Sequence, residues 1–191
     1  MQNSFYSDAE LSALGFSKFG ENCKISRFAR FYGISNISIG DFVRIDDFAI
    51  ISVQSKSTFG NYVHIGAMSF ISSKLGVDFG SYSTFSSRVS AYGQSDDYSG
   101  NSLTNPMISD SLKDVEQKRI LIGSHVIVGA NSVILPNGSL ADGVAVGALS
   151  LVKNPTEPWG IYTGIPASRK KHRSKQLMQF LFETKNSLPI D

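Results

Sequence analysis

The sequence predicts an all-β solenoid, and two observations carry that prediction. A bulky aliphatic residue returns at every sixth position from Ile122 to Val152, and glycine follows it directly in half of the cases. A period of six fits neither a helix face nor an alternating strand, whose side chains repeat every 3.6 and 2 residues. Short strands that turn a corner after every six-residue block, stacked coil upon coil, account for it.

The same six-residue pattern begins weakly near Phe19 and slips once between Val53 and Thr58. In each block we expect the first and fifth residues to point into the core. The second residue, usually Gly, Asp or Ser, is expected at a corner where unusual backbone angles or local hydrogen bonds help. Three blocks then make one coil, and coils stack at about 4.8 Å. The clearest further blocks start at Ile39, Ile45, Phe59, Ile65, Phe79 and Phe85.

Length and composition indicate one folded domain. The 191 residues are 41% hydrophobic and 18% charged, and the net charge of +2 is too small to indicate a nucleic-acid partner. The only cysteine, Cys23, has no partner for an internal disulfide, which favours a reducing compartment. No apolar run is long enough to span a membrane, and the N-terminus lacks the apolar segment of a signal peptide. We therefore expect a cytoplasmic protein that is not inserted in a membrane.

Composition also divides the chain into parts. A polar stretch interrupts the repeat, and a loop of that length in a compact solenoid is more often functional than accidental. A basic, amphipathic stretch from about Ser168 to Thr184 predicts a terminal helix. The predicted parts are an N-terminal cap with one short helix (1–18), a repeat body (19–153), a protruding active-site loop within it (94–118), and a closing segment with a helix (154–191).

Three features together resemble the hexapeptide-repeat acyltransferases: the six-residue run, the polar loop, and Gly164-Ile165-Pro166-Ala167 followed by basic residues. The resemblance covers residues 19–170 and is closest to the sugar O-acetyltransferase branch, which acts on maltose, galactosides and surface polysaccharides. It implies a left-handed parallel β-helix and a homotrimer with active sites between neighbouring helices. It also implies acetyl-CoA as the co-substrate, lying along the groove between them.

The catalytic base is where this chain departs from that family. Most members carry a loop histidine in a motif ending Thr-His-Pro, and Asp96 stands in its place here. An aspartate, with a pKa of about 3.9, is a poor base towards a hydroxyl, whereas histidine at about 6.5 is well matched. We predict His64 as the base, because it aligns with a family residue of the acceptor pocket, with Asp96 or Asp97 orienting it. His125 or a loop aspartate as the base, and His64 as a plain surface residue, remain alternatives.

The remaining site residues follow from the resemblance. Ala130 and Ala148 match the positions whose backbone binds the pantetheine arm, and the Ala130 N–H is the implied oxyanion donor. Tyr98 in the loop is expected to contact the sugar. The residues expected to meet the phosphates of coenzyme A are Lys153, Arg169 and Lys170.

The sequence therefore predicts acetyl-CoA-dependent O-acetylation of a sugar, in surface polysaccharide or O-antigen synthesis. One alternative is N-acetylation of a nucleotide-linked amino sugar, because a neutral amine attacks a thioester without prior deprotonation. Another is a non-catalytic β-helix scaffold, which would not need both the polar loop and the basic tail. We expect no metal site, because the three histidines are too scattered to bind zinc together.

Overall fold

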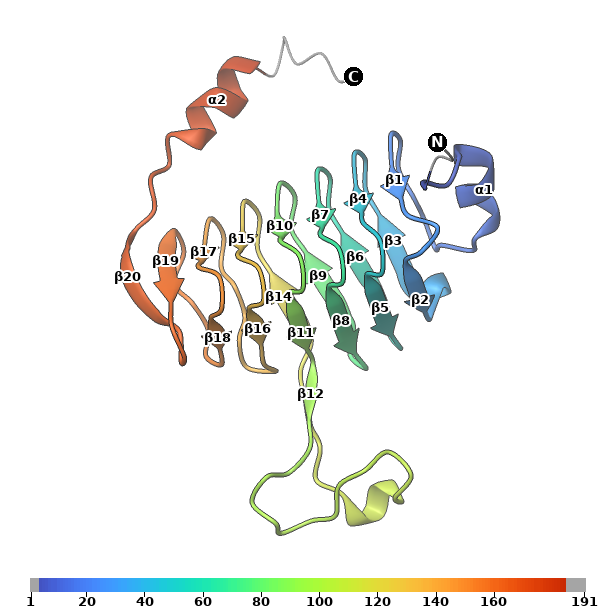
Figure 1. Cartoon of the computed structure of the whole chain (residues 1–191), viewed down its shortest axis with the longest axis vertical. Helices are drawn as coiled ribbons and strands as arrows, with labels where there is room; N and C mark the ends of the chain where they lie inside the picture. Colours follow the sequence, from blue (N-terminus) through green and yellow to red (C-terminus); the bar gives the residue numbers. More distant parts are fainter. Residues whose placement is uncertain (1–3, 185–191) are drawn as a thin grey trace.

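The computed structural model describes residues 4–184, and its body is a β-helix of about seven coils (Figure 1). The strands form three parallel faces, named A, B and C in the order in which each coil visits them. Face A holds β3 (Ile37–Ile39), β6 (Ser57–Phe59), β9 (Val77–Phe79) and β14 (Ile120–Ile122). Face B holds β1 (Lys24–Ile25), β4 (Arg44–Ile45), β7 (His64–Ile65), β10 (Thr84–Phe85), β15 (Ile127–Val128), β17 (Ala145–Val146), β19 (Gly160–Thr163) and β20 (Ser168–His172). Face C holds β2 (Arg30–Tyr32), β5 (Ile50–Val53), β8 (Phe70–Ser73), β11 (Ser90–Tyr92), β16 (Val133–Ile134) and β18 (Leu151–Val152).

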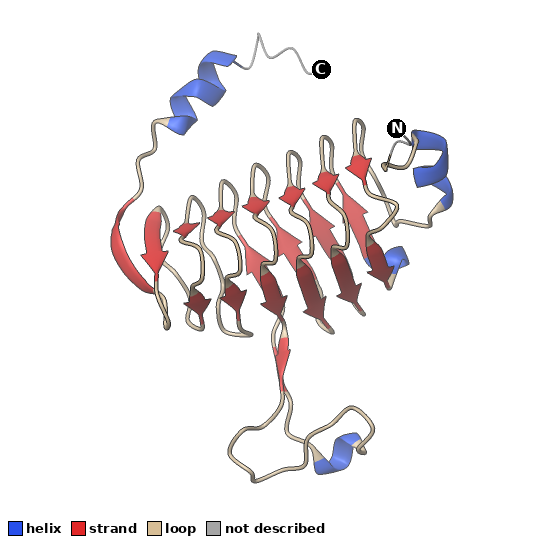
Figure 2. Ribbon diagram, viewed as in Figure 1, coloured by secondary structure: helices blue, strands red, loops and turns tan. Residues whose placement is uncertain are grey.

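The predicted loop leaves the body after β11 and returns before β14. Its root is an antiparallel ribbon of β12 (Gln94–Ser95) and β13 (Glu116–Gln117), and its tip contains the short helix η2 (Asp110–Leu112). Figure 2 shows the loop projecting from one corner of the body, with a strand at its root. The expected fold class, a left-handed parallel β-helix with a protruding loop and a short C-terminal helix, is confirmed.

The interior follows the six-residue pattern. The first residues of the blocks are buried, as at Ile45 and Ile65, and so are the fifth residues, as at Val43 and Val63. Fully burying one such side chain stabilises the fold by about 1.5–3 kcal/mol. The sequence slip also has a structural origin: Arg44 pairs with His64 twenty positions on, whereas Ile127 pairs with Ala145 eighteen positions on. The early face C strands, such as β5, are longer than the late ones, such as β16.

The expectation for the second position of each block is wrong in part. Glycine is needed there for close approach of the coils, since a Cβ on Gly40 would lie 2.8 Å from the Gly60 carbonyl carbon. The left-handed backbone angle occurs two residues later, at non-glycine residues such as Phe42 (φ 56°) and Tyr62 (φ 56°). The corner therefore turns at the fourth position, while the second position supplies space.

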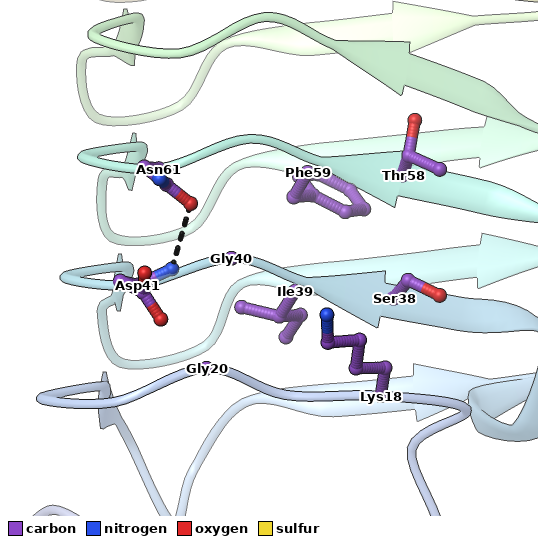
Figure 3. A pocket seen from close by; sticks show the side chains of 9 residues that line it. All are labelled: Lys18, Gly20, Ser38, Ile39, Gly40, Asp41, Thr58, Phe59 and Asn61. Atoms are coloured by element: carbon purple, nitrogen blue, oxygen red, sulfur yellow. Dashed lines mark hydrogen bonds between the residues drawn. The ribbon is translucent and has the colours of Figure 1, made fainter.

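Corner AB, between faces A and B, is closed by side chains of the following coil. The Asn61 Oδ1 accepts a hydrogen bond from the Asp41 N–H at 2.9 Å (Figure 3), and the Asp41 Oδ1 accepts one from the Glu21 N–H at 2.9 Å. Rings stack over the same corner, with centroids 4.8 Å apart for Phe42 and Tyr62. The stack continues through Tyr82, His125 and Trp159.

The two ends of the solenoid are covered by the chain termini. At the N-terminal end, helix α1 (Asp8–Ala13) begins after Ser7, whose N–H donates to the Glu10 carboxylate, and it buries Leu11 against the first coil. A 3-10 turn, η1 (Ile34–Asn36), follows β2. At the other end, β20 pairs antiparallel with β19. The terminal helix predicted from Ser168 is therefore shorter than expected, because α2 covers only Leu177–Thr184.

Candidate active site

Corner BC, between faces B and C, exposes backbone N–H groups that corner AB covers. The third residue of the block that starts on face B lies there, and in the third to sixth coils it is Ala67, Ser87, Ala130 and Ala148. Within residues 4–184, none of these four N–H groups donates to another group of the protein. Alanine has no side-chain acceptor with which to cap the coil before it. The Ala130 N–H is thus free to donate to a ligand, as its expected role as oxyanion donor requires.

Ser86 lies at the same corner and was missed by the sequence analysis. Its block position is occupied by glycine in the neighbouring coils, at Gly66, Gly129 and Gly147. The half-buried Ser86 hydroxyl has no hydrogen-bond partner within the described chain. Its signal in the sequence is weak, because Ser26 and Asp46 also stand in place of glycine at this block position in the first two coils.

The two loop aspartates, Asp96 and Asp97, differ in their hydrogen-bond partners. The Asp97 carboxylate accepts hydrogen bonds from the Ser99 N–H at 2.7 Å and from the Ser102 N–H and hydroxyl at 2.9 and 3.0 Å. These bonds, those from Ser99 foremost, lower the pKa of Asp97 to about 2. Asp97 therefore organises the loop and is a weak proton acceptor. The exposed Asp96 carboxylate, one residue earlier, has no partner among the described residues.

His64 does not meet either loop aspartate within one chain. Its Nε2 lies 2.8 Å from Asp46 Oδ2, and Arg44 Nε donates to Asp46 Oδ1 at 2.7 Å. Burial raises the pKa of Asp46, but the hydrogen bonds from His64 and Arg44 outweigh burial and hold that pKa below its usual range. His64 lies on face B, whereas the loop leaves the corner between faces C and A. A dyad of His64 with Asp96 or Asp97 therefore requires a second copy of the chain, and it stays a prediction.

The other two histidines lie away from the loop. His125 stacks at corner AB against Tyr82 and Trp159, with ring centroids 5.2 and 6.3 Å away, and burial lowers its pKa. His172 is exposed at the end of β20. Neither arrangement provides a base beside the Ala130 N–H.

The predicted phosphate-binding cations lie on the late coils. Lys153 is exposed just after β18. On β20, Arg169 Nε lies 3.6 Å from the Glu157 carboxylate, and Lys170 Nζ donates to the Ser168 hydroxyl at 2.8 Å. All three are accessible to a ligand. Tyr98 in the loop is 94% exposed, so its ring is equally available.

Two further observations bear on other classes of function. No helix among the described residues is long and apolar enough to cross a membrane. Across residues 4–184, no three His, Cys, Asp or Glu side chains are grouped so as to hold a metal ion.

Comparisons with known proteins identify the family. No protein-family model matches the chain. An Escherichia coli dTDP-4-amino-4,6-dideoxy-D-glucose acyltransferase is 41% identical over 176 residues, which cover 92% of each protein. The crystal structure of the N-acyltransferase AntD from Bacillus cereus, in complex with dTDP and 3-hydroxybutyryl-CoA, is 41% identical with a TM-score of 0.93, and the match covers 97% of this chain and 98% of AntD.

A more distant structure supports the fold alone. A maltose O-acetyltransferase from Clostridium difficile is 16% identical with a TM-score of 0.60, covering 91% of this chain and 81% of that one. The resemblance found in the sequence is confirmed, and so is the enzyme class. This chain belongs to the sugar-modifying branch of the hexapeptide-repeat acyltransferases and is an acyltransferase that uses acyl-coenzyme A as its co-substrate.

Proposed function

We propose that this enzyme transfers an acyl group from acyl-coenzyme A to the amino group of a nucleotide-linked amino sugar. The E. coli relative is named for a dTDP-linked 4-amino-4,6-dideoxyglucose, and AntD was crystallised with that sugar nucleotide and coenzyme A. An amine acceptor also fits a site without a loop histidine. O-acetylation of a sugar hydroxyl, with a role in surface polysaccharide synthesis, is the second candidate, because a putative lipopolysaccharide biosynthesis O-acetyl transferase of Escherichia coli K12 is 31% identical over 65 residues, or 34% of this chain.

The unpaired carboxylate of Asp96 carries this proposal. Crystallised AntD variants replace one serine and one aspartate that lie ten positions apart. Two pairs in this chain have that spacing near the loop, Ser86 with Asp96 and Ser87 with Asp97. Asp97 is already occupied by three hydrogen bonds within the loop, so Ser86 and Asp96 are the pair available to a substrate.

The chemistry then follows from the residues. The amine nitrogen attacks the thioester carbonyl carbon, and a C–N bond forms as the carbonyl becomes an oxyanion that accepts a hydrogen bond from the Ala130 N–H. The nitrogen becomes positively charged in that intermediate and is strongly acidic, so the Asp96 carboxylate can take its proton. The C–S bond breaks next, which yields an amide and coenzyme A.

The cofactor side of the proposal uses corner BC and the late coils. The pantetheine arm lies along the free N–H groups of Ala130 and Ala148, with Tyr98 against the sugar. The coenzyme A phosphates meet charged side chains that are accessible in the free protein. These are Lys153, Arg169 and Lys170.

We further propose a homotrimer that acts in the cytoplasm, where nucleotide sugars and acyl-coenzyme A are both available. In such an assembly the loop of one copy, which carries Asp96, faces His64 and the Ala130 N–H of the next. There His64 serves as a substrate contact for an amine acceptor, or as the base if the acceptor is a hydroxyl.

A thiol-release assay tests the acceptor directly. Purified protein is mixed with acetyl-CoA or 3-hydroxybutyryl-CoA and with a panel of dTDP-amino sugars, the matching dTDP-sugars with a hydroxyl in place of the amine, and free sugars. We expect release only with the amino sugars, and an amide product by mass spectrometry. Release with hydroxyl sugars alone establishes the second candidate instead.

A further inference from the structure

A hollow of about 270 Å³ lies at the root of the loop. Its walls come from the corner after β8, from the β12 strand and from the returning part of the loop. Asp96 lies in this wall together with two cations, Lys74 and Lys113. The hollow therefore combines one carboxylate with two ammonium groups from distant parts of the chain.

On the lysine side of the hollow, Lys113 already forms an ion pair with a carboxylate of the protein, that of Asp110. Lys113 Nζ lies 2.8 Å from Asp110 Oδ1, and the Lys113 side chain is only 8% exposed while that of Asp110 is 87% exposed. The hydrogen bond from Lys113 and the charges of Lys113 and Lys74 lower the pKa of Asp110. Lys113 and Lys74 thus stabilise the ionised form of Asp110, although that carboxylate is mostly exposed to water. The Lys74 ammonium makes no hydrogen bond of its own within residues 4–184.

We infer that the hollow binds the sugar-diphosphate part of the acceptor, with the diphosphate against Lys74 and Lys113 and the amino group against Asp96. The inference rests on the proposed function and adds the means by which a nucleotide-linked sugar is distinguished from a free one. Such an acceptor carries negative charge at one end of the sugar and an ammonium or amine at the other, which matches the charges of the walls. Ammonium groups bind phosphate oxygens through charge-assisted hydrogen bonds.

The size of the hollow agrees with this assignment. Pockets that enclose a whole drug-sized ligand run from about 300 to 1,000 Å³. A hollow of about 270 Å³ takes a sugar ring with its diphosphate and leaves the nucleoside outside. The enzyme then distinguishes acceptors mostly by their diphosphate and amine, and little by the nucleobase.

Direct binding of dTDP, measured by titration calorimetry, tests the lysines without any chemical step. We expect Lys74→Gln and Lys113→Gln each to weaken dTDP binding about tenfold or more, and to raise KM for the amino-sugar nucleotide by a similar factor, with KM for acyl-CoA unchanged. Lys74→Arg, which keeps the charge, retains most of the affinity. Lys24→Gln, an exposed lysine on face B of the first coil, is the matched control and leaves dTDP binding unchanged.

Two outcomes overturn the inference. One is unchanged dTDP binding in both glutamine variants, and the other is a raised KM for acyl-CoA with unchanged dTDP affinity, which assigns the hollow to the cofactor. If Lys113→Gln fails to fold, as circular dichroism would show, Lys74→Gln decides alone. The proposed function fails separately, when the wild-type enzyme makes no amide from an amino sugar although its dTDP affinity still depends on Lys74.

Discussion

Corners AB and BC arise from the same six-residue block, yet one is closed and the other open. At corner AB, an acceptor side chain such as Asn61 caps the N–H of the preceding coil, and stacked rings lie over the turn. At corner BC, alanine stands at the matching position in three coils, so the N–H groups stay available. One side-chain acceptor per coil thus decides whether a corner stabilises the fold or presents hydrogen-bond donors to a ligand.

The largest expected effect concerns the base that must reach corner BC. We expect Asp96→Asn to lower kcat with an amino-sugar acceptor about 10²–10⁴-fold, because the amide cannot take the proton from the attacking nitrogen. His64→Gln serves as the comparison and is expected to lower kcat less than tenfold. Steady-state kinetics on both variants measure this. A larger loss in His64→Gln than in Asp96→Asn would return the role of base to His64.

The second prediction concerns a substitution that gives corner BC the side-chain cap found at corner AB. In Ala148→Asn, the new side chain occupies the position from which Asn61 caps Asp41, and so it caps the Ala130 N–H. We expect kcat to fall about 10²-fold, which is the effect of losing one oxyanion donor, while the unfolding free energy stays the same or rises slightly. Ala67→Asn makes the same change away from Ala130 and keeps its activity. Wild-type turnover in Ala148→Asn would show that the Ala130 N–H is not the donor.

The third prediction concerns the loss of a side-chain cap at corner AB. Asn61→Ala removes the acceptor of the Asp41 N–H and is expected to lower the unfolding free energy by about 1 kcal/mol, with turnover unchanged. Urea unfolding followed by circular dichroism measures it. Ser87→Ala at corner BC, where the serine caps nothing, should change stability by less than about 0.5 kcal/mol. Equal losses in the two variants would remove the distinction between the corners.

The smallest effect is the acid sensitivity of the loop. Because the pKa of Asp97 is about 2 in the folded protein, below the ordinary value near 3.9, its hydrogen bonds contribute fully above about pH 4. That contribution is lost as the pH falls towards 2. Limited proteolysis should therefore cut the loop of Asp97→Asn faster than that of the wild-type protein at pH 7 and at pH 5. Near pH 2 the two cleavage rates should be nearly the same. A difference that has vanished by pH 5 contradicts this assignment.

The sequence predicted the fold well because burial repeats with the block. The first-position residues from Ile39 onwards, such as Ile45 and Ile65, are buried in the structure, whereas Phe19 at the weak start of the pattern is partly buried. The C-terminal segment was predicted less well, since Ser168–His172 was included in the helix but lies beside β19, and pairing with that strand decides its conformation.

The residues proposed for the site could be named from the sequence, but their contacts could not. Asp96 was named from its place in the loop, and Ala130 and Ala148 from the family resemblance, and their roles stay predictions. The partner of His64 was not named, because Asp46 lies eighteen positions earlier and is brought beside it only by the stacking of coils. Ser86 was not singled out, because Ser26 and Asp46 also replace glycine at its block position and its significance depends on the free N–H groups around it.

The reversed strand β20 has a consequence for how copies of this protein can assemble. A parallel β-helix ends in a strand edge onto which the first coil of another molecule could add, and such additions would continue without limit. Because β20 runs antiparallel and its side chains are all exposed, including Arg169, Lys170 and Lys171, that edge offers a neighbouring first coil neither the matching direction nor an apolar surface. The reversed, charged strand therefore disfavours addition of another molecule at this end of the solenoid.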